Sequence, residues 1–95
     1  MPYADEYSEY LTEILKKLKQ RDPGQFASVY KKIREIRESL DLSPEHYKPL
    51  AHGMKGFRRV HVHKSFVLIF KVDVERKTVR FEDYDHHDNV YRKYR

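Results

Sequence analysis

Histidines stand close to arginines and lysines at three places in the second half of the chain. Residues 58–63 read Arg-Arg-Val-His-Val-His, and residues 85–88 read Asp-His-His-Asp. Residues 46–55 include His46, Lys48, His52 and Lys55. A histidine side chain can take up or release a proton near neutral pH, because its pKa ordinarily lies there. Arginine and lysine can stabilise the negative charge that develops on a reacting phosphate. These residue types together suit chemistry at a phosphodiester.

The same mixture suits the metal-free cleavage of RNA. In that reaction the 2′-hydroxyl attacks the neighbouring phosphate, one group removes the hydroxyl proton, and a second group protonates the leaving 5′-oxygen. Flanking bases can stack on aromatic side chains, for which the best-placed candidates are Tyr84, Tyr91 and Tyr94. We therefore predict that the second half of the chain binds RNA and cleaves it without a cofactor.

Each histidine group also has a structural interpretation. His46 and His52 suit the surface of a loop, His61 suits a half-buried strand position, and His63 suits a turn. Asp85 can be the N-cap of a short helix that begins at the histidine pair behind it. That pair could also share a zinc ion with the strand histidines, but the spacing matches no known metal pattern, so we predict no metal site.

The first forty residues carry the period of two helices. Apolar side chains recur at helical spacing in two segments, first at Tyr7, Tyr10, Leu11, Ile14, Leu15 and Leu18, then at Phe26, Val29, Tyr30, Ile33, Ile36 and Leu40. Asp22 is placed as the N-cap of the second helix, Pro23 as its first residue and Gln25 as the partner in a capping box. The short connection predicts an antiparallel helix hairpin over residues 1–40.

Three strands are predicted from the two-residue period at residues 57–62, 66–72 and 78–84, and their short connections favour an antiparallel meander. If the first turn is the three-residue segment 63–65, the helices cover the face that carries Val60, Val62, Leu68, Phe70, Val72, Val79 and Phe81. The opposite face then carries Arg59, His61, Lys71, Arg80 and Glu82. A turn of even length would instead place His61 on the covered face.

These segments predict one α+β domain over residues 1–95, with the helix hairpin packed on the small antiparallel meander. The hairpin is followed by a loop over residues 41–56, the sheet over residues 57–84, and a short C-terminal helix or basic tail over residues 85–95. A strand formed by residues 2–4 would be too short to predict.

Charge and composition limit the class of protein. The net charge is +5, from 20 Lys and Arg against 15 Asp and Glu, which favours an anionic partner. The chain has no cysteine, which excludes disulfides and suits the cytoplasm. The longest apolar run, residues 66–70, is too short to cross a membrane, and the start of the chain does not look like a signal peptide.

The segment Lys48-Pro-Leu-Ala-His-Gly-Met-Lys-Gly-Phe-Arg-Arg-Val-His-Val-His63 resembles the RelE/ParE superfamily of type II toxins, above all its YafQ and YoeB branches. In those proteins a Pro-Leu loop leads through a Gly-aromatic pair into a strand. An apolar strand like residues 68–71 and a histidine-containing tail like residues 84–91 follow. The resemblance covers residues 45–92. It implies a RelE-like fold and an mRNA interferase that cleaves mRNA on the ribosome and forms a hetero-oligomer with a cognate antitoxin.

The resemblance also implies roles for individual residues. His61 matches the strand histidine of YafQ-like proteins and His87 the tail histidine, so these two would share the general acid and base roles. The predicted catalytic set is His61, His87, Arg59, His63 and His86. The residues expected to bind mRNA or 16S ribosomal RNA are Lys55, Arg58, His52, Arg80 and Tyr91.

Three positions depart from these branches. Ser65 stands where an acidic residue is usual, Lys48 where a histidine or glutamate is, and Val67 where an arginine is. His63 or His86 could therefore have taken over a role in proton transfer. Two alternatives stay open: a ParE-like toxin that inhibits DNA gyrase through protein contact, and a degenerate toxin that binds without cleaving.

Overall fold

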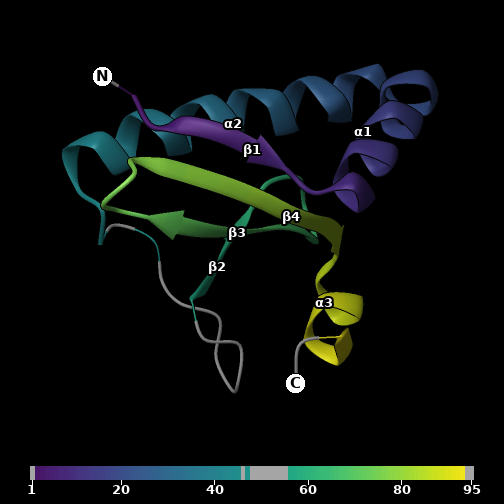
Figure 1. Ribbon diagram of the computed structural model, residues 1–95. Coiled ribbons are helices and arrows are strands. Elements are labelled where there is room, and N and C mark those ends of the chain that lie inside the picture. Colours follow the sequence, from purple (N-terminus) through teal and green to yellow (C-terminus); the bar gives the residue numbers. More distant parts are fainter. Residues whose placement is uncertain (1, 46, 48–55, 94–95) are drawn as a thin grey trace.

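The computed structural model describes residues 2–45, 47 and 56–93. Its elements in chain order are β1 (Ala4–Tyr7), α1 (Glu9–Arg21), α2 (Pro23–Leu42), β2 (Phe57–His61), β3 (Phe66–Asp73), β4 (Thr78–His86) and α3 (His87–Lys93). α1 and α2 lie on one face of a single sheet, and α3 lies beyond the end of β4 on the other side (Figure 1). The α+β class and the helix pair packed on an antiparallel meander are confirmed.

The sheet has the strand order β1-β4-β3-β2. β2, β3 and β4 form the predicted meander, whereas β1 pairs in parallel with the first half of β4, from Ala4 opposite Thr78 to Tyr7 opposite Phe81. The sequence prediction was therefore one strand short, and the residues assigned to the helix hairpin include a strand. The first helix correspondingly begins at Glu9, two residues later than the apolar period indicates.

Contacts with α2 hold the segment that leads into β1. The side chain of Tyr3 is 1% exposed, and the Arg37 Nε donates a hydrogen bond to the Tyr3 carbonyl at 2.6 Å. Ser8 follows β1 and caps α1, because its Oγ accepts a hydrogen bond from the Leu11 N–H at 3.0 Å and donates one to the Glu82 carbonyl at 2.7 Å. One residue thus joins the end of β1, the start of α1 and the middle of β4.

The start of α2 follows the sequence prediction. Asp22 is the N-cap, and its carboxylate accepts a hydrogen bond from the Gln25 N–H at 3.1 Å, with Pro23 in the first position of the helix. The Gln25 side chain does not complete a capping box. Its Nε2 donates instead to the Tyr84 hydroxyl at 2.8 Å, and both side chains are buried.

The register of the meander agrees with the prediction of an odd first turn. His61 pairs with Val67, and the Val62 N–H donates to the Phe66 carbonyl at 3.0 Å, which leaves a turn of three residues, 63–65. The expected face packs against α1 and α2: Leu68, Phe70, Val79 and Phe81 are fully buried, while Val60, Val62 and Val72 are partly buried against the same core. Arg59 and His61 consequently point to the opposite face.

A β-bulge in β4 changes which side chains reach that opposite face. Ile69 of β3 pairs with Asp83, but the next residue, Phe70, pairs with Phe81, so Glu82 has no opposite partner. Glu82 and Asp83 therefore both point away from α1 and α2, and Tyr84 points toward them. Tyr84 is 4% exposed, so its predicted role in stacking RNA bases is wrong for the molecule in this conformation.

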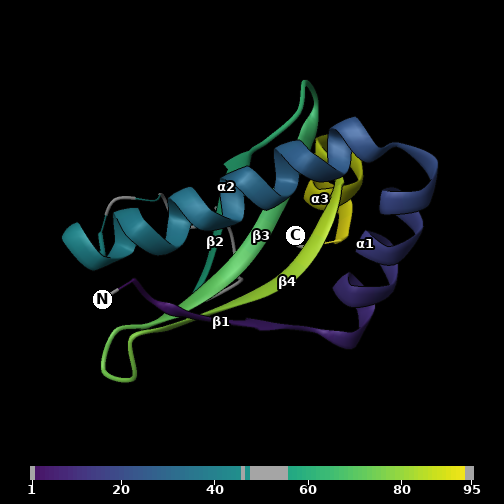
Figure 2. The same cartoon turned by 90° about the horizontal axis from the view of Figure 1, so that it is seen from above.

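The tail forms a helix that covers a small second core. Val90 of α3 is fully buried against Val67 and Ile69 on the face away from α1 and α2. Seen from above, α3 lies behind α2, near the end of β4 (Figure 2). The predicted N-cap is corrected, because Asp85 still belongs to β4 and the helix begins at His87.

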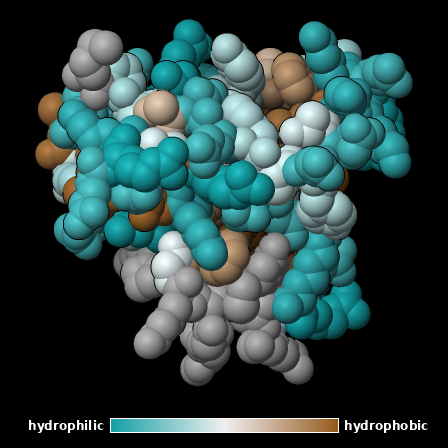
Figure 3. Space-filling view, in the orientation of Figure 1, coloured by the Kyte–Doolittle hydropathy of each residue, from teal (hydrophilic) through white to brown (hydrophobic). Residues whose placement is uncertain are grey.

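The surface shows one further departure from the sequence prediction. Tyr10 and Tyr30, which the helical period places in the core, are each 57% exposed. Most of the face seen in Figure 3 is hydrophilic, with hydrophobic atoms in small patches. None of the described helices has the length and the apolar character that crossing a bilayer requires.

Candidate active site on the open face of the sheet

The two histidines expected to transfer protons lie together. His61 ends β2 and His87 begins α3, and their ring centroids are 6.4 Å apart. The His87 N–H donates to the Ser65 carbonyl at 2.7 Å, which fixes the start of α3 beside the turn between β2 and β3. Since that turn follows His61 directly, one backbone hydrogen bond brings the two histidines to the same edge of the molecule.

Arg59 and Tyr91 complete the group. Arg59 lies two residues before His61 on the same face of β2, and its guanidinium carbon is 5.8 Å from the centre of the Tyr91 ring. The Tyr91 ring meets the His87 ring edge-on, with centroids 5.7 Å apart. The side chains of β2 and α3 therefore form one cluster, which we call the His61 cluster: His61, Arg59, His87 and Tyr91.

Two polar atoms of the His61 cluster have no partner within the part of the chain that the structure describes. Arg59 Nε and His87 Nδ1 are both buried, and neither makes a hydrogen bond there. Buried polar groups in proteins are nearly always hydrogen-bonded, so each such atom needs an explanation. Because both atoms are closed off from solvent, they do not by themselves mark a position that a ligand can reach.

His86 and Asp88 flank the cluster. The His86 ring lies 5.4 Å from the His87 ring and meets the Phe66 ring edge-on at 5.7 Å. His86 Nδ1 accepts a hydrogen bond from the Asp88 N–H at 3.3 Å, a role like that of an N-cap. The Asp88 carboxylate stands 3.4 Å from His87 Nε2, so it can orient that ring. For His63 the structure shows no hydrogen bond, ion pair or ring contact of the side chain to the other described histidines.

Other predicted site residues lie elsewhere. Arg58 points to the face of α1 and α2 and donates to the Pro44 carbonyl just beyond α2. Arg80 shares the face of the His61 cluster but pairs with Glu82 at 2.7 Å, and its neighbour in β3 is Lys71. That position is four residues along β3 from the partner of His61, about 13 Å away at 3.3 Å per residue. His52 and Lys55, with His46, Lys48 and Tyr94, lie outside the described residues.

Lys93, which holds α3 in place, was not among the predicted site residues. Lys93 Nζ lies 2.9 Å from an Asp85 carboxylate oxygen and 3.0 Å from one of Asp83, and it donates to the Tyr10 hydroxyl at 3.2 Å. Burial by itself would lower the pKa of Lys93, but the hydrogen bonds to Asp85, Asp83 and Tyr10 outweigh it and raise that pKa. Burial would raise the pKa of Asp85, but its hydrogen bonds from Lys93, Asn89 and the His86 backbone lower it.

With the geometry in place, comparison with other proteins defines the family. A sequence model described as the ParE toxin of the type II toxin–antitoxin system parDE matches residues 3–91. The chain belongs to this toxin family. The toxin is also 47% identical, over 91 residues, to a Methanocaldococcus jannaschii protein provisionally named toxin RelE4, and the alignment covers 96% of this chain and 93% of that protein.

Two solved structures place the toxin within the RelE/ParE superfamily. The RelBE2 toxin–antitoxin complex of Mycobacterium tuberculosis contains a chain with a TM-score of 0.67 and 25% identity, covering 90% of this chain and 99% of that one. The DinJ–YafQ complex of E. coli contains a chain with a TM-score of 0.64 and 27% identity, and the match covers 94% of this chain and 98% of that one. The resemblance inferred from the sequence is thereby confirmed.

One group of side chains in the toxin has the composition of a metal site. Ligand atoms of His86, His87 and Asp88 lie within 4.8 Å of one another. His61 and His63, which the zinc interpretation of the sequence requires, are not part of this group. The group offers three donors, of which Asp88 is the most exposed, whereas a closed structural zinc site has four.

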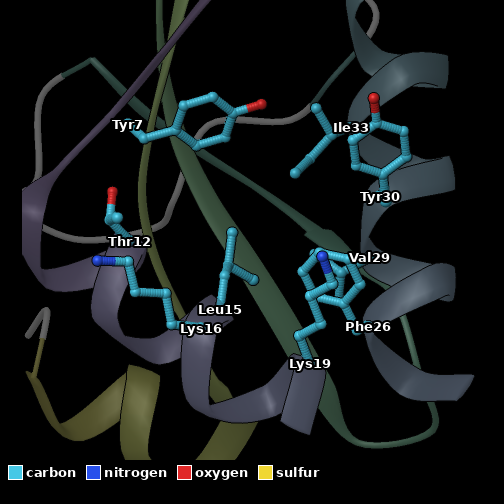
Figure 4. Close-up of a pocket in the computed structure, with 9 residues that line it drawn as sticks. All are labelled: Tyr7, Thr12, Leu15, Lys16, Lys19, Phe26, Val29, Tyr30 and Ile33. Atoms are coloured by element: carbon cyan, nitrogen blue, oxygen red, sulfur yellow. The ribbon is translucent and has the colours of Figure 1, made fainter. Parts of the chain in front are cut away.

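A separate groove of about 290 Å³ lies between α1 and α2 of the toxin, on the other side of the sheet from the His61 cluster. Side chains from both helices and from β1 point into it (Figure 4). Its lining is largely apolar but includes two lysines. The lining residues are Tyr7, Thr12, Leu15, Lys16, Lys19, Phe26, Val29, Tyr30 and Ile33.

Proposed function

We propose that this toxin is an endoribonuclease that cleaves mRNA on the ribosome, with the His61 cluster as its active site. The observation that carries the proposal is the histidine pair, with ring centroids 6.4 Å apart, beside the Arg59 guanidinium, which contacts the Tyr91 ring. The net charge of +5 suits a polyanionic substrate.

In the proposed reaction one of the two imidazoles removes the proton from a ribose 2′-hydroxyl. The 2′-oxygen then attacks the adjacent phosphorus, the bond from phosphorus to the 5′-oxygen breaks, and the other imidazole, of the His61 and His87 pair, protonates that oxygen. The products are a 2′,3′-cyclic phosphate and a free 5′-hydroxyl. Each imidazole needs a hydrogen bond of about 2.6–3.2 Å to its own oxygen. With ring centroids 6.4 Å apart, both imidazoles can face one phosphodiester that lies alongside the pair.

Arg59 and Tyr91 have supporting roles in this proposal. The Arg59 guanidinium stabilises the additional negative charge on the phosphate oxygens in the transition state. The Tyr91 ring, which contacts both Arg59 and His87, keeps these groups in place and offers a face on which a base can stack. His86 packs on Phe66 and its Nδ1 accepts a hydrogen bond at the start of α3, so we propose a structural role for it and assign proton transfer to His61 and His87.

The experiment is cleavage of mRNA in a translating cell-free extract to which the purified toxin is added, with 5′ ends mapped by primer extension. We expect cuts at discrete codon positions that disappear with a His61→Ala, His87→Ala double variant. Each single substitution should reduce the rate by roughly 10²–10⁴-fold. Intact mRNA in the presence of folded toxin would contradict the proposal.

A second candidate function follows from the family description itself, which names a ParE toxin. A ParE-like toxin would inhibit DNA gyrase through protein contact and would need no acid–base pair. Intact mRNA together with inhibited supercoiling by gyrase would support this candidate. Intact mRNA without inhibition of gyrase would instead indicate a toxin-fold binding protein that has lost catalysis.

We further propose a cytoplasmic hetero-oligomer with a cognate antitoxin, by analogy with the RelBE2 and DinJ–YafQ complexes. The groove between α1 and α2 suits an amphipathic antitoxin segment, because Lys16 and Lys19 at its edge would pair with acidic side chains. Tyr30, 57% exposed on this groove, is a suitable probe. Tyr30→Glu should weaken binding of the antitoxin and leave mRNA cleavage unchanged, whereas equal affinity would exclude this docking surface.

A further inference from the structure

Lys93 joins three elements at one point. Its ammonium lies 3.0 Å from Asp83 and 2.9 Å from Asp85, both on β4, and 3.2 Å from the hydroxyl of Tyr10 on α1. Its charge also lies 5.2 Å from the centre of the Tyr10 ring. Asp83 is 1% exposed, and the bulge at Glu82 is what turns its carboxylate toward α3. A lysine is thus held by two carboxylates and a phenol at the C-terminal end of α3.

The position of α3 depends on few contacts. The helix has 7 residues, which is far below the length at which an isolated helix is stable in water. Among its described residues, Val90 is the one that is buried, and it packs on Val67 and Ile69. The backbone bond of His87 to Ser65 fixes the start of the helix, so Lys93 is the charged contact that fixes the other end.

The same short helix carries half of the His61 cluster. His87 is its first residue and Tyr91 lies one turn further on, between His87 and Lys93. If the Lys93 end of the helix moves, the His87 and Tyr91 rings shift relative to His61 and Arg59, which are fixed on β2. Rates of enzymatic reactions are sensitive to such shifts, since a displacement of about 1 Å can cost on the order of 10²-fold.

We propose that Lys93 is a positioning residue for RNA cleavage: its ion pairs with Asp83 and Asp85 hold α3 so that His87 faces His61 at the distance the reaction needs. The inference rests on the proposed function of the His61 cluster. Lys93 itself touches neither the substrate nor the reacting atoms, and its effect on the rate passes through the orientation of α3.

The test is single-turnover cleavage of mRNA on programmed ribosomes by the full chain, measured as the maximal rate and the half-saturating ribosome concentration. Lys93→Met keeps the length of the side chain and removes its charge. We expect the maximal rate to fall by roughly 10–10²-fold, with the half-saturating concentration unchanged, and Lys93→Arg to recover most of the rate. The matched control is Lys77→Met, which removes an ion pair to Asp41 of 2.7 Å outside the His61 cluster.

Thermal melting of each variant separates positioning from folding. A folded Lys93→Met protein with the full maximal rate would overturn the proposal, as would a loss of rate that Lys93→Arg fails to restore. If Lys93→Met does not fold, Asp85→Asn removes one carboxylate, leaves Asp83, and should lower the maximal rate in the same direction. His87→Ala is measured in parallel. If His87→Ala keeps full activity, the proposed active site fails, whereas inactive His87→Ala with fully active Lys93→Met refutes the positioning role alone.

Discussion

The hydrogen bond between Gln25 and Tyr84 offers a sharp test of the register of β4. Gln25 Nε2 donates to the Tyr84 hydroxyl at 2.8 Å, and the two residues are 8% and 4% exposed. Burial raises the pKa of Tyr84, and the bond from Gln25 offsets part of that rise. Tyr84→Phe removes the hydroxyl and keeps the ring, which stacks on Phe66 with centroids 5.3 Å apart.

The magnitude follows from what the substitution leaves behind. The amide of Gln25 would stay buried without its acceptor, which costs about 1–3 kcal/mol of unfolding free energy. For a domain of this size, each 1 kcal/mol shifts the melting temperature by about 4–8 °C, so the expected fall is roughly 5–20 °C. Tyr84→Phe combined with Gln25→Leu replaces both partners by apolar groups and should recover much of this loss.

Melting followed by circular dichroism measures the effect, with RNA affinity determined in parallel for the same variants. We expect lower stability and unchanged affinity for RNA. A Tyr84→Phe protein that melts like the wild type and loses RNA affinity would refute the reasoning, because it would place the Tyr84 hydroxyl at a ligand and not in the core. The double variant guards against a nonspecific effect, since a true bond predicts that the two substitutions are not additive.

Three further predictions concern the His61 cluster and α3. Arg59→Ala should reduce mRNA cleavage by about 10²–10³-fold if the guanidinium stabilises the transition state, and Arg59→Lys should retain part of the rate; a single-turnover assay decides. Val90→Ala removes fully buried methyl groups and should lower the unfolding free energy by about 1–3 kcal/mol, measured by urea denaturation; an unchanged midpoint would contradict the packing of α3. Because the folded-state pKa of Asp85 lies below its ordinary value, its contribution to stability is present above about pH 4 and is lost as the pH falls through the folded pKa. Melting curves across that range should therefore be less pH-dependent for Asp85→Asn than for the wild type.

The larger part of the fold could be predicted because local patterns determine it. The helical period over most of α1 and α2, the cap at Asp22 and the three-residue turn before Phe66 each depend on residues close in sequence, and each of these agrees with the structure. β1 escaped prediction because its four residues, Ala-Asp-Glu-Tyr, show no strand period. Pairing with β4 and the contact of Tyr3 with Arg37 hold this segment, and both join residues that are far apart in the sequence.

Predictions of the face on which a side chain lies were wrong where the strand period or the helix period breaks down. Strict alternation along β4 would have turned Asp83 toward the helices and Tyr84 away from them, and the bulge at Glu82 reverses both positions. Tyr10 and Tyr30 lie at the margins of the apolar stripes of their helices, where periodicity cannot tell a core position from a surface one.

The spacing of His61 and Arg59 allowed the prediction that they lie together, because residues two apart on a strand share a face. It could not find Lys93, since the carboxylates that bind it are aligned by the same bulge in β4. The roles of the cluster residues in catalysis stay predictions that the experiments above address.

The parallel pairing of β1 with β4 also affects when the protein can fold during its synthesis. Ser8 is bonded to Glu82, 74 residues further along, so the first strand cannot close the sheet until nearly the whole chain has been made. At about 5–20 residues per second, that wait lasts roughly 4–15 s. Long-range pairings of this kind raise the contact order and slow folding. The His61 cluster includes His87 and Tyr91 of α3, so it cannot form before α3 has been synthesised.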